Sequence, residues 1–350
     1  MYRVNTLLHK LLAVLIVAVA LTLLSCNAKD ESGKHKTKTE KNKSLDEADN
    51  EEATVTDIDT AAYRKKVEAL ANGDTTGRWP VKHTPFPLDG AILPFKRIVA
   101  FYGNMYSKRM GVLGEYPPKE LWRMLKSEMH KWELVDPTTP VQPAIHYIAT
   151  VAQGSPQKDG FYCQRMPDRQ IDSALNIAAM GNAIVFLDIQ VGKSTVMNEV
   201  PRLEKYLKMP KVHLGIDPEF SMKEGQAPGK KIGYMDASDI NFCSDYLAKI
   251  VRANNLPPKI LIVHRFTQGM IKNYKNIHLH REVQIVMNMD GWGEPTLKFD
   301  TYKSYIYREP VQFTGFKLFY KNDLKKAPNR MLTPEEIMKL KPHPIYIQYQ

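Results

Sequence analysis

The sequence predicts a (β/α)-barrel of seven or eight parallel strands that follows a disordered N-terminal tether. Short apolar runs alternate along the chain with segments of helical periodicity, which is typical of parallel sheets built with right-handed crossovers. The runs are apolar on both faces, as buried parallel strands are. Several of them end in an acid, an amide or a histidine. A barrel of this kind has its active site at the carboxyl ends of its strands, so these residues predict a site there.

The first residues have the layout of a signal peptide. In residues 1–25 a positively charged start precedes an apolar run at 11–24 that is too short to span a bilayer. The run ends in Leu23-Leu-Ser-Cys26, which resembles the lipobox of bacterial lipoproteins. The resemblance implies cleavage before Cys26, lipidation of its thiol and a membrane anchor in the bacterial cell envelope. An ordinary signal peptide or a small uncleaved anchor is the alternative.

Residues 26–60 are predicted to form the tether that carries the lipidated cysteine. They hold no Phe, Tyr or Trp and many charges of both signs, so they bury too little apolar surface to offset their chain entropy. Lys29-Asp-Glu31 resembles the acidic export signals of surface lipoproteins in Bacteroidetes-type bacteria, which implies exposure on the outer membrane. A plain solvated tether is the alternative. Residues 61–350 are enough for a single barrel domain.

Seven apolar runs are the predicted strands: 97–103, 144–153, 183–190, 212–219, 259–264, 283–290 and 313–320. The run 231–235 is either an eighth strand or one arm of a hairpin. An open doubly wound sheet is the alternative to a closed barrel. That fold is expected to carry a glycine-rich phosphate-binding turn after its first strand, and 102–106 is not such a turn.

Helical periodicity falls between these runs. The predicted helices are 117–132, 170–180, 196–207 and 237–252, with weaker candidates at 268–274 and 299–307. Paired prolines suit the start of the first helix. Gly181 and Asn182 suit the end of the second helix, and Asp236 or Ser238 suits the start of the fourth.

The net charge of +11 is concentrated in the predicted barrel, because the tether holds more acids than lysines. This balance favours anionic surroundings such as acidic glycans, phosphate polymers or lipid headgroups. No basic stripe interleaved with aromatic residues is present, so nucleic acid is not an expected partner. Cys163 and Cys243 form either a disulfide or two buried thiols. No cysteine or histidine spacing indicates zinc, and no metal or cofactor is predicted.

The run 212–219 carries the strongest catalytic signal. Strand alternation places His213, Gly215, Asp217 and Glu219 on one face, and the glycine leaves room beneath the two carboxylates. Two neighbouring acids can have their pKa values pushed apart, which provides a proton donor and a charged partner. The Gly-Ile-Asp-Pro-Glu run resembles the Asp-x-Glu that ends the fourth strand of chitinase-like glycoside hydrolases. The resemblance implies that Glu219 is the general acid and that Asp217 supports it. A loop cap or a structural salt bridge is the alternative.

Two further strand ends bring carboxylates to the same rim. Asp188 and Gln190 end the preceding strand and are predicted to bind substrate hydroxyls or to support a carboxylate, with helix capping as the alternative. Asp290 ends a strand across the mouth and is predicted to act with Glu219 as nucleophile or base. Trp292 lies between glycines, where its ring could stack on a sugar. A tight Asp-Gly turn is the alternative there.

Other polar residues at strand ends are predicted to bind substrate. His264 could act as a base, a donor or a ligand, with a structural histidine as the alternative. Arg265 could clamp a carboxylate or a phosphate. Tyr102 and Gln153 lie at the ends of the first two strands.

The layout as a whole resembles the TIM-barrel glycoside hydrolases. It implies an exported lipoprotein that cleaves glycosidic bonds in a polysaccharide, which could be anionic, by carboxylate acid–base chemistry. Two alternatives stay open. A non-catalytic glycan-binding lipoprotein would use the same groove. A metal-dependent phosphodiesterase would hold a divalent cation and a phosphate with the same rim residues: Asp188, Asp217, Glu219 and Asp290 for the cation, and His264 and Arg265 for the phosphate.

Overall fold

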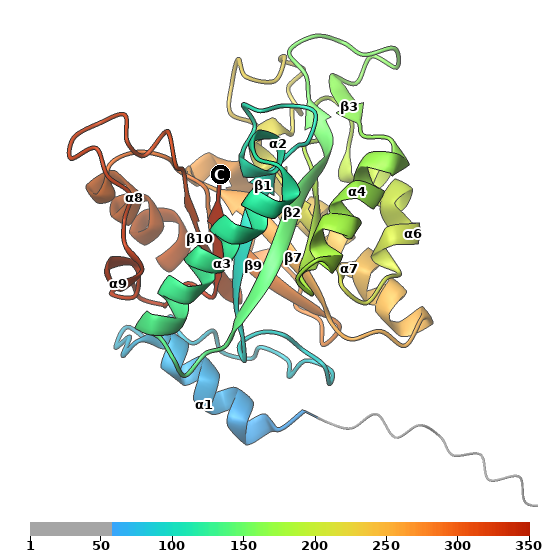
Figure 1. Ribbon diagram of the computed structural model, residues 1–350. Coiled ribbons are helices and arrows are strands. Elements are labelled where there is room, and N and C mark those ends of the chain that lie inside the picture. Colours follow the sequence, from blue (N-terminus) through green and yellow to red (C-terminus); the bar gives the residue numbers. More distant parts are fainter. Residues whose placement is uncertain (1–57) are drawn as a thin grey trace, which may run out of the picture. The chain divides into compact units, whose positions relative to one another are not determined.

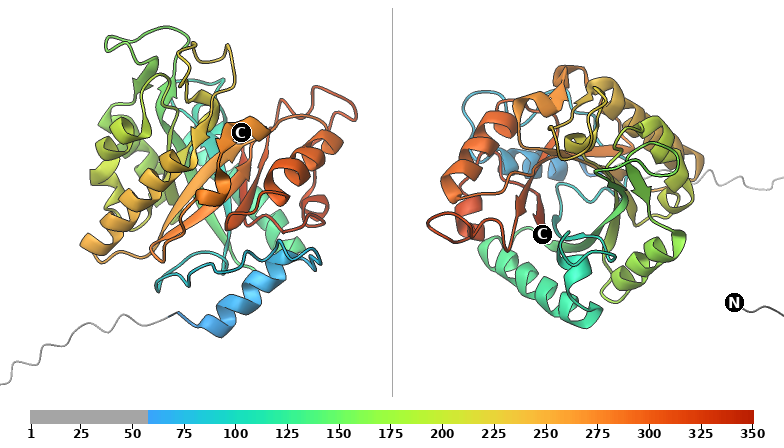
Figure 2. Two further views of the ribbon diagram at one scale, coloured as in Figure 1. Left: turned by 180° about the vertical axis from the view of Figure 1, so that it is seen from behind. Right: turned by 90° about the horizontal axis from the view of Figure 1, so that it is seen from above.

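A computed structural model of the protein describes residues 58–350. The predicted signal peptide, Cys26 and most of the predicted tether lie outside the described residues. Eight parallel strands form a closed barrel, in which each strand pairs with the next and the last pairs with the first (Figures 1 and 2). The strands are β1 Arg97–Gly103, β2 Val141–Ala152, β4 Ile184–Ile189, β5 Val212–Ile216, β7 Lys259–Arg265, β9 Val283–Met289, β10 Phe313–Leu318 and β11 Tyr346–Tyr349. The predicted fold class is confirmed.

Seven of the eight barrel strands form where they were predicted, because both of their faces are buried. Every residue of β1, β4, β5, β7, β9, β10 and β11 is buried. Side chains on the outer face pack against the surrounding helices in one large apolar cluster. Inward side chains fill the lower half of the barrel with a second apolar cluster, which includes Ile98, Phe186, Ile262, Val286 and Tyr346. The barrel is therefore filled below, and its polar inward positions lie above this layer.

The helices lie outside the strands, as Figure 2 shows in the view from above. They are α1 Thr60–Ala71, α2 Val112–Glu115, α3 Pro118–Val135, α4 Asp168–Ala179, α5 Val196–Glu199, α6 Glu204–Leu207, α7 Ala237–Ala253, α8 Pro295–Thr301 and α9 Pro334–Ile337. The predicted helix 196–207 is interrupted by a 3₁₀ turn, Val200–Leu203. Pro201 lies in this turn and lacks the N–H that a continuous α-helix needs. The weaker candidate 299–307 is helical, since α8 continues into the π-helical segment Tyr302–Tyr307.

The eighth barrel strand is not the candidate segment 231–235. It is β11, at the very end of the chain, which closes the barrel between β10 and β1. The segment 231–235 contributes only β6 Met235–Asp236, which pairs with β8 Ile271–Lys272 in a separate two-stranded sheet. The predicted helix 268–274 is a 3₁₀ turn, Gln268–Met270, that leads into β8. A further strand, β3 Cys163–Arg165, extends β2 as an antiparallel edge.

Helix α1, for which no prediction was made, lies at the end of the barrel opposite the carboxyl ends of the strands (Figure 1). Asp59 caps it by accepting hydrogen bonds from the backbone of Ala61 and Ala62. Tyr63 is buried and makes edge-on contacts with Phe86 and Phe95. These rings belong to the cluster that fills the lower barrel, so α1 and the following segment close the amino end.

Cys163 and Cys243 are buried free thiols, so of the two alternatives the disulfide is excluded. Burial raises the pKa of the Cys163 thiol to about 11, which keeps it protonated. Among the described residues, no helix has the length and apolarity needed to cross a membrane.

Candidate active site at the mouth of the barrel

A cavity of about 520 Å³ opens at the carboxyl ends of the strands. Its walls carry three carboxylates, two cationic side chains and several aromatic rings. Six residues predicted from the sequence line it: Tyr102, Gln190, Asp217, Glu219, Asp290 and Trp292. They meet because inward positions at the ends of neighbouring parallel strands converge on the barrel axis.

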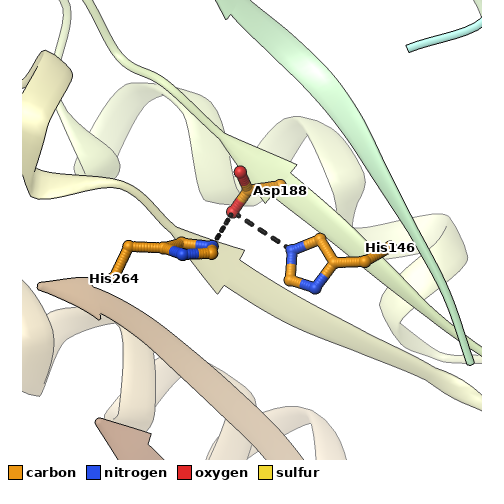
Figure 3. A group of neighbouring side chains, drawn as sticks. All are labelled: His146, Asp188 and His264. Carbon is orange, nitrogen blue, oxygen red and sulfur yellow. Dashed lines mark ion pairs between the residues drawn. The ribbon is translucent and has the colours of Figure 1, made fainter. Parts of the chain in front are cut away.

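The layer beneath this cavity is a buried group of two histidines and one aspartate (Figure 3). The Nε2 atoms of His146 and His264 lie 3.4 and 3.6 Å from Oδ1 of Asp188. Tyr102 donates a hydrogen bond of 2.9 Å to the other oxygen, Oδ2. Asp188 and His264 therefore lie one layer below the cavity surface, and they act on a substrate only through the side chains above them.

Burial and ion pairing give the three side chains of this layer very different pKa values. Burial disfavours the charge of Asp188, but the two imidazoles outweigh it and hold the pKa of Asp188 well below its ordinary value. Burial likewise opposes protonation of His264, yet Asp188 and Asp290 raise the pKa of His264 to about 10. For His146 burial dominates and lowers the pKa to about 4.

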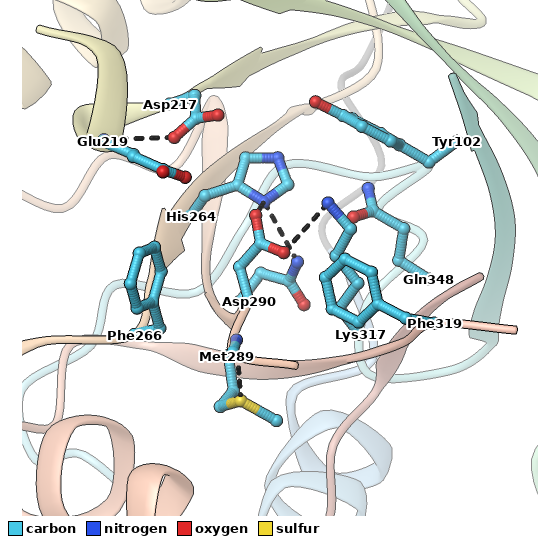
Figure 4. A network of polar contacts seen from close by, with 12 residues as sticks. Tyr102, Asp217, Glu219, His264, Phe266, Met289, Asp290, Lys317, Phe319 and Gln348 are labelled. Carbon is cyan, nitrogen blue, oxygen red and sulfur yellow. Dashed lines mark hydrogen bonds and ion pairs between the residues drawn. The ribbon is translucent and has the colours of Figure 1, made fainter. Parts of the chain in front are cut away.

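Asp290 follows β9 and faces into the mouth as an ionised carboxylate (Figure 4). Its Oδ1 lies 2.9 Å from Nζ of Lys317 and its Oδ2 lies 3.0 Å from Nδ1 of His264. Burial alone would raise the pKa of Asp290, but these two cations outweigh it and lower the pKa. Lys317, an inward lysine of β10, also lies 3.9 Å from the centre of the Tyr102 ring. The pairing keeps Asp290 charged and fixed in direction.

Glu219 reaches the mouth on a turn at the end of β5. The strand ends at Ile216, and Pro218 begins the 3₁₀ turn Pro218–Phe220. Oδ1 of Asp217 accepts a 3.1 Å hydrogen bond from the Glu219 backbone N–H, which holds the turn in place (Figure 4). The Glu219 carboxyl has no ion-pair partner among residues 58–350. Burial and the charge of Asp290 raise the pKa of Glu219 to about 7, although Lys317 and His264 act against them.

Asp217 has a different environment from Asp290. Burial raises its pKa well above the ordinary value, and the neighbouring acids add to this effect. Gln190 donates a 3.3 Å hydrogen bond to Oδ2 of Asp217. Asp217 therefore contacts both the turn that carries Glu219 and the amide of Gln190.

The loop that carries Trp292 is held from below. Nζ of Lys298 donates to the carbonyl oxygens of Gly291 and Lys317, at 2.9 and 2.8 Å. Asp323 accepts a 3.0 Å hydrogen bond from the Gly293 N–H and is the ion-pair partner of Lys298. The Trp292 side chain remains 47% exposed at the rim of the cavity. A fixed loop with an exposed indole is a suitable platform for the apolar face of a sugar.

Besides Asp188 and His264, which lie in the layer beneath, two predicted residues do not reach the cavity. Gln153 lies beyond β2, where its side chain bonds the carbonyl oxygen of Val151. Arg265 occupies an outward position because it follows the inward His264 on the same strand. Its guanidinium donates to three backbone carbonyl oxygens and pairs with Glu309, so it holds neighbouring loops together.

We expect Arg265→Met to lower the free energy of unfolding by about 3 kcal/mol, because it leaves Glu309 and three carbonyl groups without their buried cation. Urea denaturation measures this loss. Arg252→Met is the matched control, since Arg252 pairs with Glu282 at the surface and its loss should cost less than about 1 kcal/mol. A stable Arg265→Met protein that loses substrate affinity would contradict the structural role.

Sequence reasoning missed His146 and Lys317. Both are polar residues inside otherwise apolar runs, and strand alternation places each on the inward face of its strand. A polar residue at an inward position of an apolar strand is the signal by which both could have been found. Among the described residues, His146, Asp188 and His264 are the group of potential metal ligands whose donor atoms lie within 4.8 Å of one another. Asp217, Glu219 and Asp290 are not part of that group.

No family model and no curated protein sequence matches the chain. Among solved structures, the chain is similar to a mutant form of Thermotoga maritima Cel5A in complex with cellobiose, with 11% identity and a TM-score of 0.39. The match covers 73% of this chain and 88% of Cel5A. A Bacillus subtilis mannanase matches with 10% identity and a TM-score of 0.36, covering 74% and 81% of the two chains. At this degree of similarity neither protein indicates a substrate for this chain.

Proposed function

We propose that the protein hydrolyses glycosidic bonds, with Glu219 as the proton donor and Asp290 as the charged partner. One observation carries this proposal: two carboxyl groups of opposite character share one cavity. Glu219 has no ion-pair partner among the described residues and is held near neutral pKa by burial. Asp290 is paired with Lys317 and His264 and is ionised. Environments that separate the pKa values of two acids are those that assign one as the acid and the other as the base or nucleophile.

The proposed reaction begins with proton transfer from the Glu219 carboxyl to the oxygen of the glycosidic bond. The departing alcohol leaves an oxocarbenium-like sugar, and the Asp290 carboxylate acts on it in one of two ways. It deprotonates a water that attacks the sugar, or it attacks directly to form a glycosyl ester, which a water deprotonated by Glu219 then hydrolyses. Lys317 and His264 keep Asp290 ionised for this step. Trp292 would stack on a sugar ring at the rim, and Gln190 would donate a hydrogen bond to a hydroxyl.

The substrate class that we propose is a polysaccharide, with anionic chains favoured. The sequence of the barrel is basic, and the exposed Arg109 lines the cavity. Because Cys26 and the residues around it lie outside the described part, anchoring rests on the lipobox resemblance alone. We propose that the lipidated Cys26 holds the barrel at the bacterial envelope, where polymeric glycans are accessible.

The test is reducing-end release from a panel of neutral and acidic polysaccharides, with binding measured by calorimetry on the same panel. Release from one polymer class is the expected result. Binding to a polymer without turnover would replace the proposal with a glycan-binding lipoprotein. Neither binding nor turnover on any polymer would reject both.

We expect kcat/KM to fall as the pH rises above about 7. Glu219 must be protonated to donate, and its pKa is raised to about 7, so the active fraction falls tenfold for each further pH unit. Below pH 7 the acid stays protonated, and the lowered pKa of Asp290 keeps the partner ionised in weak acid. A profile of kcat/KM between pH 4 and pH 9 would show this. A rate that rises through pH 7 would instead assign Glu219 as a base.

A further inference from the structure

Three side chains from three strands point at one spot beneath the cavity. His146 comes from β2, Asp188 from β4 and His264 from β7, and all three are fully buried. The two imidazole Nε2 atoms approach the same oxygen, Oδ1 of Asp188, as the dashed lines in Figure 3 show. The three donor atoms lie within 4.8 Å of one another.

These three atoms lack hydrogen-bond partners within residues 58–350. The separations of 3.4 and 3.6 Å exceed the 2.7–3.2 Å of an ordinary N–H···O hydrogen bond. Buried polar atoms without partners are rare and costly, and each of them calls for an explanation. Two nitrogens and one oxygen that face a common point without bonding one another would be satisfied together by a cation between them.

The separations match those around a four-coordinate metal ion. Ligand bonds of about 2.1 Å place tetrahedral ligands about 3.4 Å apart and cis octahedral ligands about 3.0 Å apart. The observed 3.4 and 3.6 Å fit the tetrahedral case. Two imidazoles and one carboxylate are also a ligand set that Zn²⁺ accepts. We propose that His146, Asp188 and His264 bind a divalent transition-metal ion, with Zn²⁺ as the best-fitting member of that class.

The surrounding contacts are those of a metal site. Nδ1 of His146 forms a 2.6 Å hydrogen bond with the Tyr346 hydroxyl, and Nδ1 of His264 lies 3.0 Å from Asp290. Oδ2 of Asp188 accepts the hydrogen bond from Tyr102. Metal-bound histidines generally use their other ring nitrogen in this way, which sets the ring direction and leaves the free nitrogen aimed at the ion.

Gly215 on β5 packs directly against the ligand atoms. A Cβ at this position would lie 2.6 Å from Nε2 of His146 and still closer to Oδ1 of Asp188. Any other residue here would clash with these two atoms. The glycine therefore allows the His146 and Asp188 side chains to converge beside β5.

The ion would lie behind Tyr102, out of contact with a substrate in the cavity. Its effect on the site would pass through His264, whose orientation fixes Oδ2 of Asp290. This inference goes beyond the proposed hydrolysis and does not depend on it. The competing explanation is an ion pair in which the protonated His264 faces Asp188 directly, with a neutral His146 beside it.

The experiment is Zn²⁺ titration of the full mature chain after removal of metal with a chelator. We expect one ion per chain with a Kd below about 1 μM, and a rise in Tm of about 5 °C when Zn²⁺ is in large excess over Kd. Co²⁺ should bind at the same site and give the absorption of a four-coordinate ion. His146→Gln should weaken binding at least about 100-fold. His213→Gln is the matched control, because His213 is a buried histidine of β5 outside the group.

Failure of the wild-type chain to bind Zn²⁺ or Co²⁺ stoichiometrically would overturn the proposal in favour of the ion pair between His264 and Asp188. Binding that survives unchanged in His146→Gln would overturn it by placing the ion elsewhere. If His146→Gln does not fold, Tyr346→Phe removes only the outer hydrogen bond and should weaken binding about tenfold. Unchanged affinity in that variant counts against the site. Because metal binding is measured without substrate, the outcome of this test does not depend on whether the protein hydrolyses glycosides.

Discussion

Glu219→Gln is expected to lower kcat on a natural polysaccharide by about 10³-fold while the Kd for the polymer stays within about twofold. Glutamine keeps the shape of the side chain but has no proton to give to the leaving oxygen. Binding should persist because Trp292, Gln190 and the rest of the cavity wall are unchanged. Steady-state kinetics with reducing-end detection measure the first quantity, and calorimetry with the mutant measures the second.

The choice of substrate shows whether Glu219→Gln loses activity because the proton donor is missing or because the protein is misfolded. In an aryl glycoside of an acidic phenol, the phenolate can leave without being protonated. The rate of Glu219→Gln, as a fraction of the wild-type rate, should therefore be far higher on this substrate than on the polymer. Glu224→Gln is the matched control, since Glu224 lies in the same loop but is exposed and pairs with Lys231. A polymer rate in Glu219→Gln within tenfold of wild type would remove Glu219 from the chemistry.

Asp290→Asn is expected to lower kcat on every glycoside by about 10³-fold or more, including those with good leaving groups. The neutral amide cannot stabilise the developing sugar cation or attack it. It also leaves Lys317 and His264 without their shared carboxylate, so the cavity becomes more positive. Kinetics on the aryl glycoside distinguish this variant from Glu219→Gln, because a better leaving group cannot compensate for it.

A smaller variant at the same position tests how Asp290 acts. With Asp290→Gly, added azide should restore turnover, because it takes the place of the missing carboxylate or of the water that the carboxylate activates. The anomeric configuration of the sugar first released by the wild-type protein, retained or inverted, reports whether Asp290 is the nucleophile or the base. Asp300→Asn is the control, because Asp300 is an exposed carboxylate on the nearby helix α8. A folded Asp290→Asn protein that retains more than a tenth of the wild-type rate would contradict the assignment.

Much of the barrel could be predicted because its strands are buried on both faces. Residues 183–187 are apolar throughout and cannot be mistaken for a surface loop. Strand β11 was missed because it is four residues long and lies at the end of the chain. β11 is recognised as a strand because it fills the gap between β10 and β1. That gap exists only when the other seven strands have formed the rest of the barrel.

The placement of Glu219, Asp217 and Asp290 on one cavity followed from a single rule, that the carboxyl ends of parallel strands meet. The rule does not say which of two neighbouring residues points into the barrel, although successive side chains on a strand point to opposite faces. His264 faces inward and Arg265 faces outward, although both end the same strand. His264 and Arg265 can be distinguished only when the strand is defined with single-residue precision.

The order of seven barrel strands, their burial and the end of the barrel that holds the acids follow from the amino-acid sequence, because they depend on local composition and on spacing along the chain. Which acid is charged depends on the three-dimensional arrangement. Asp290 is ionised because Lys317 of β10 and His264 of β7 lie within 3.0 Å of it, and Glu219 is near neutral because no such cation is paired with it among the described residues. Electrostatic environment is a property of distance in space, which strand register and barrel closure set and which separation along the chain does not.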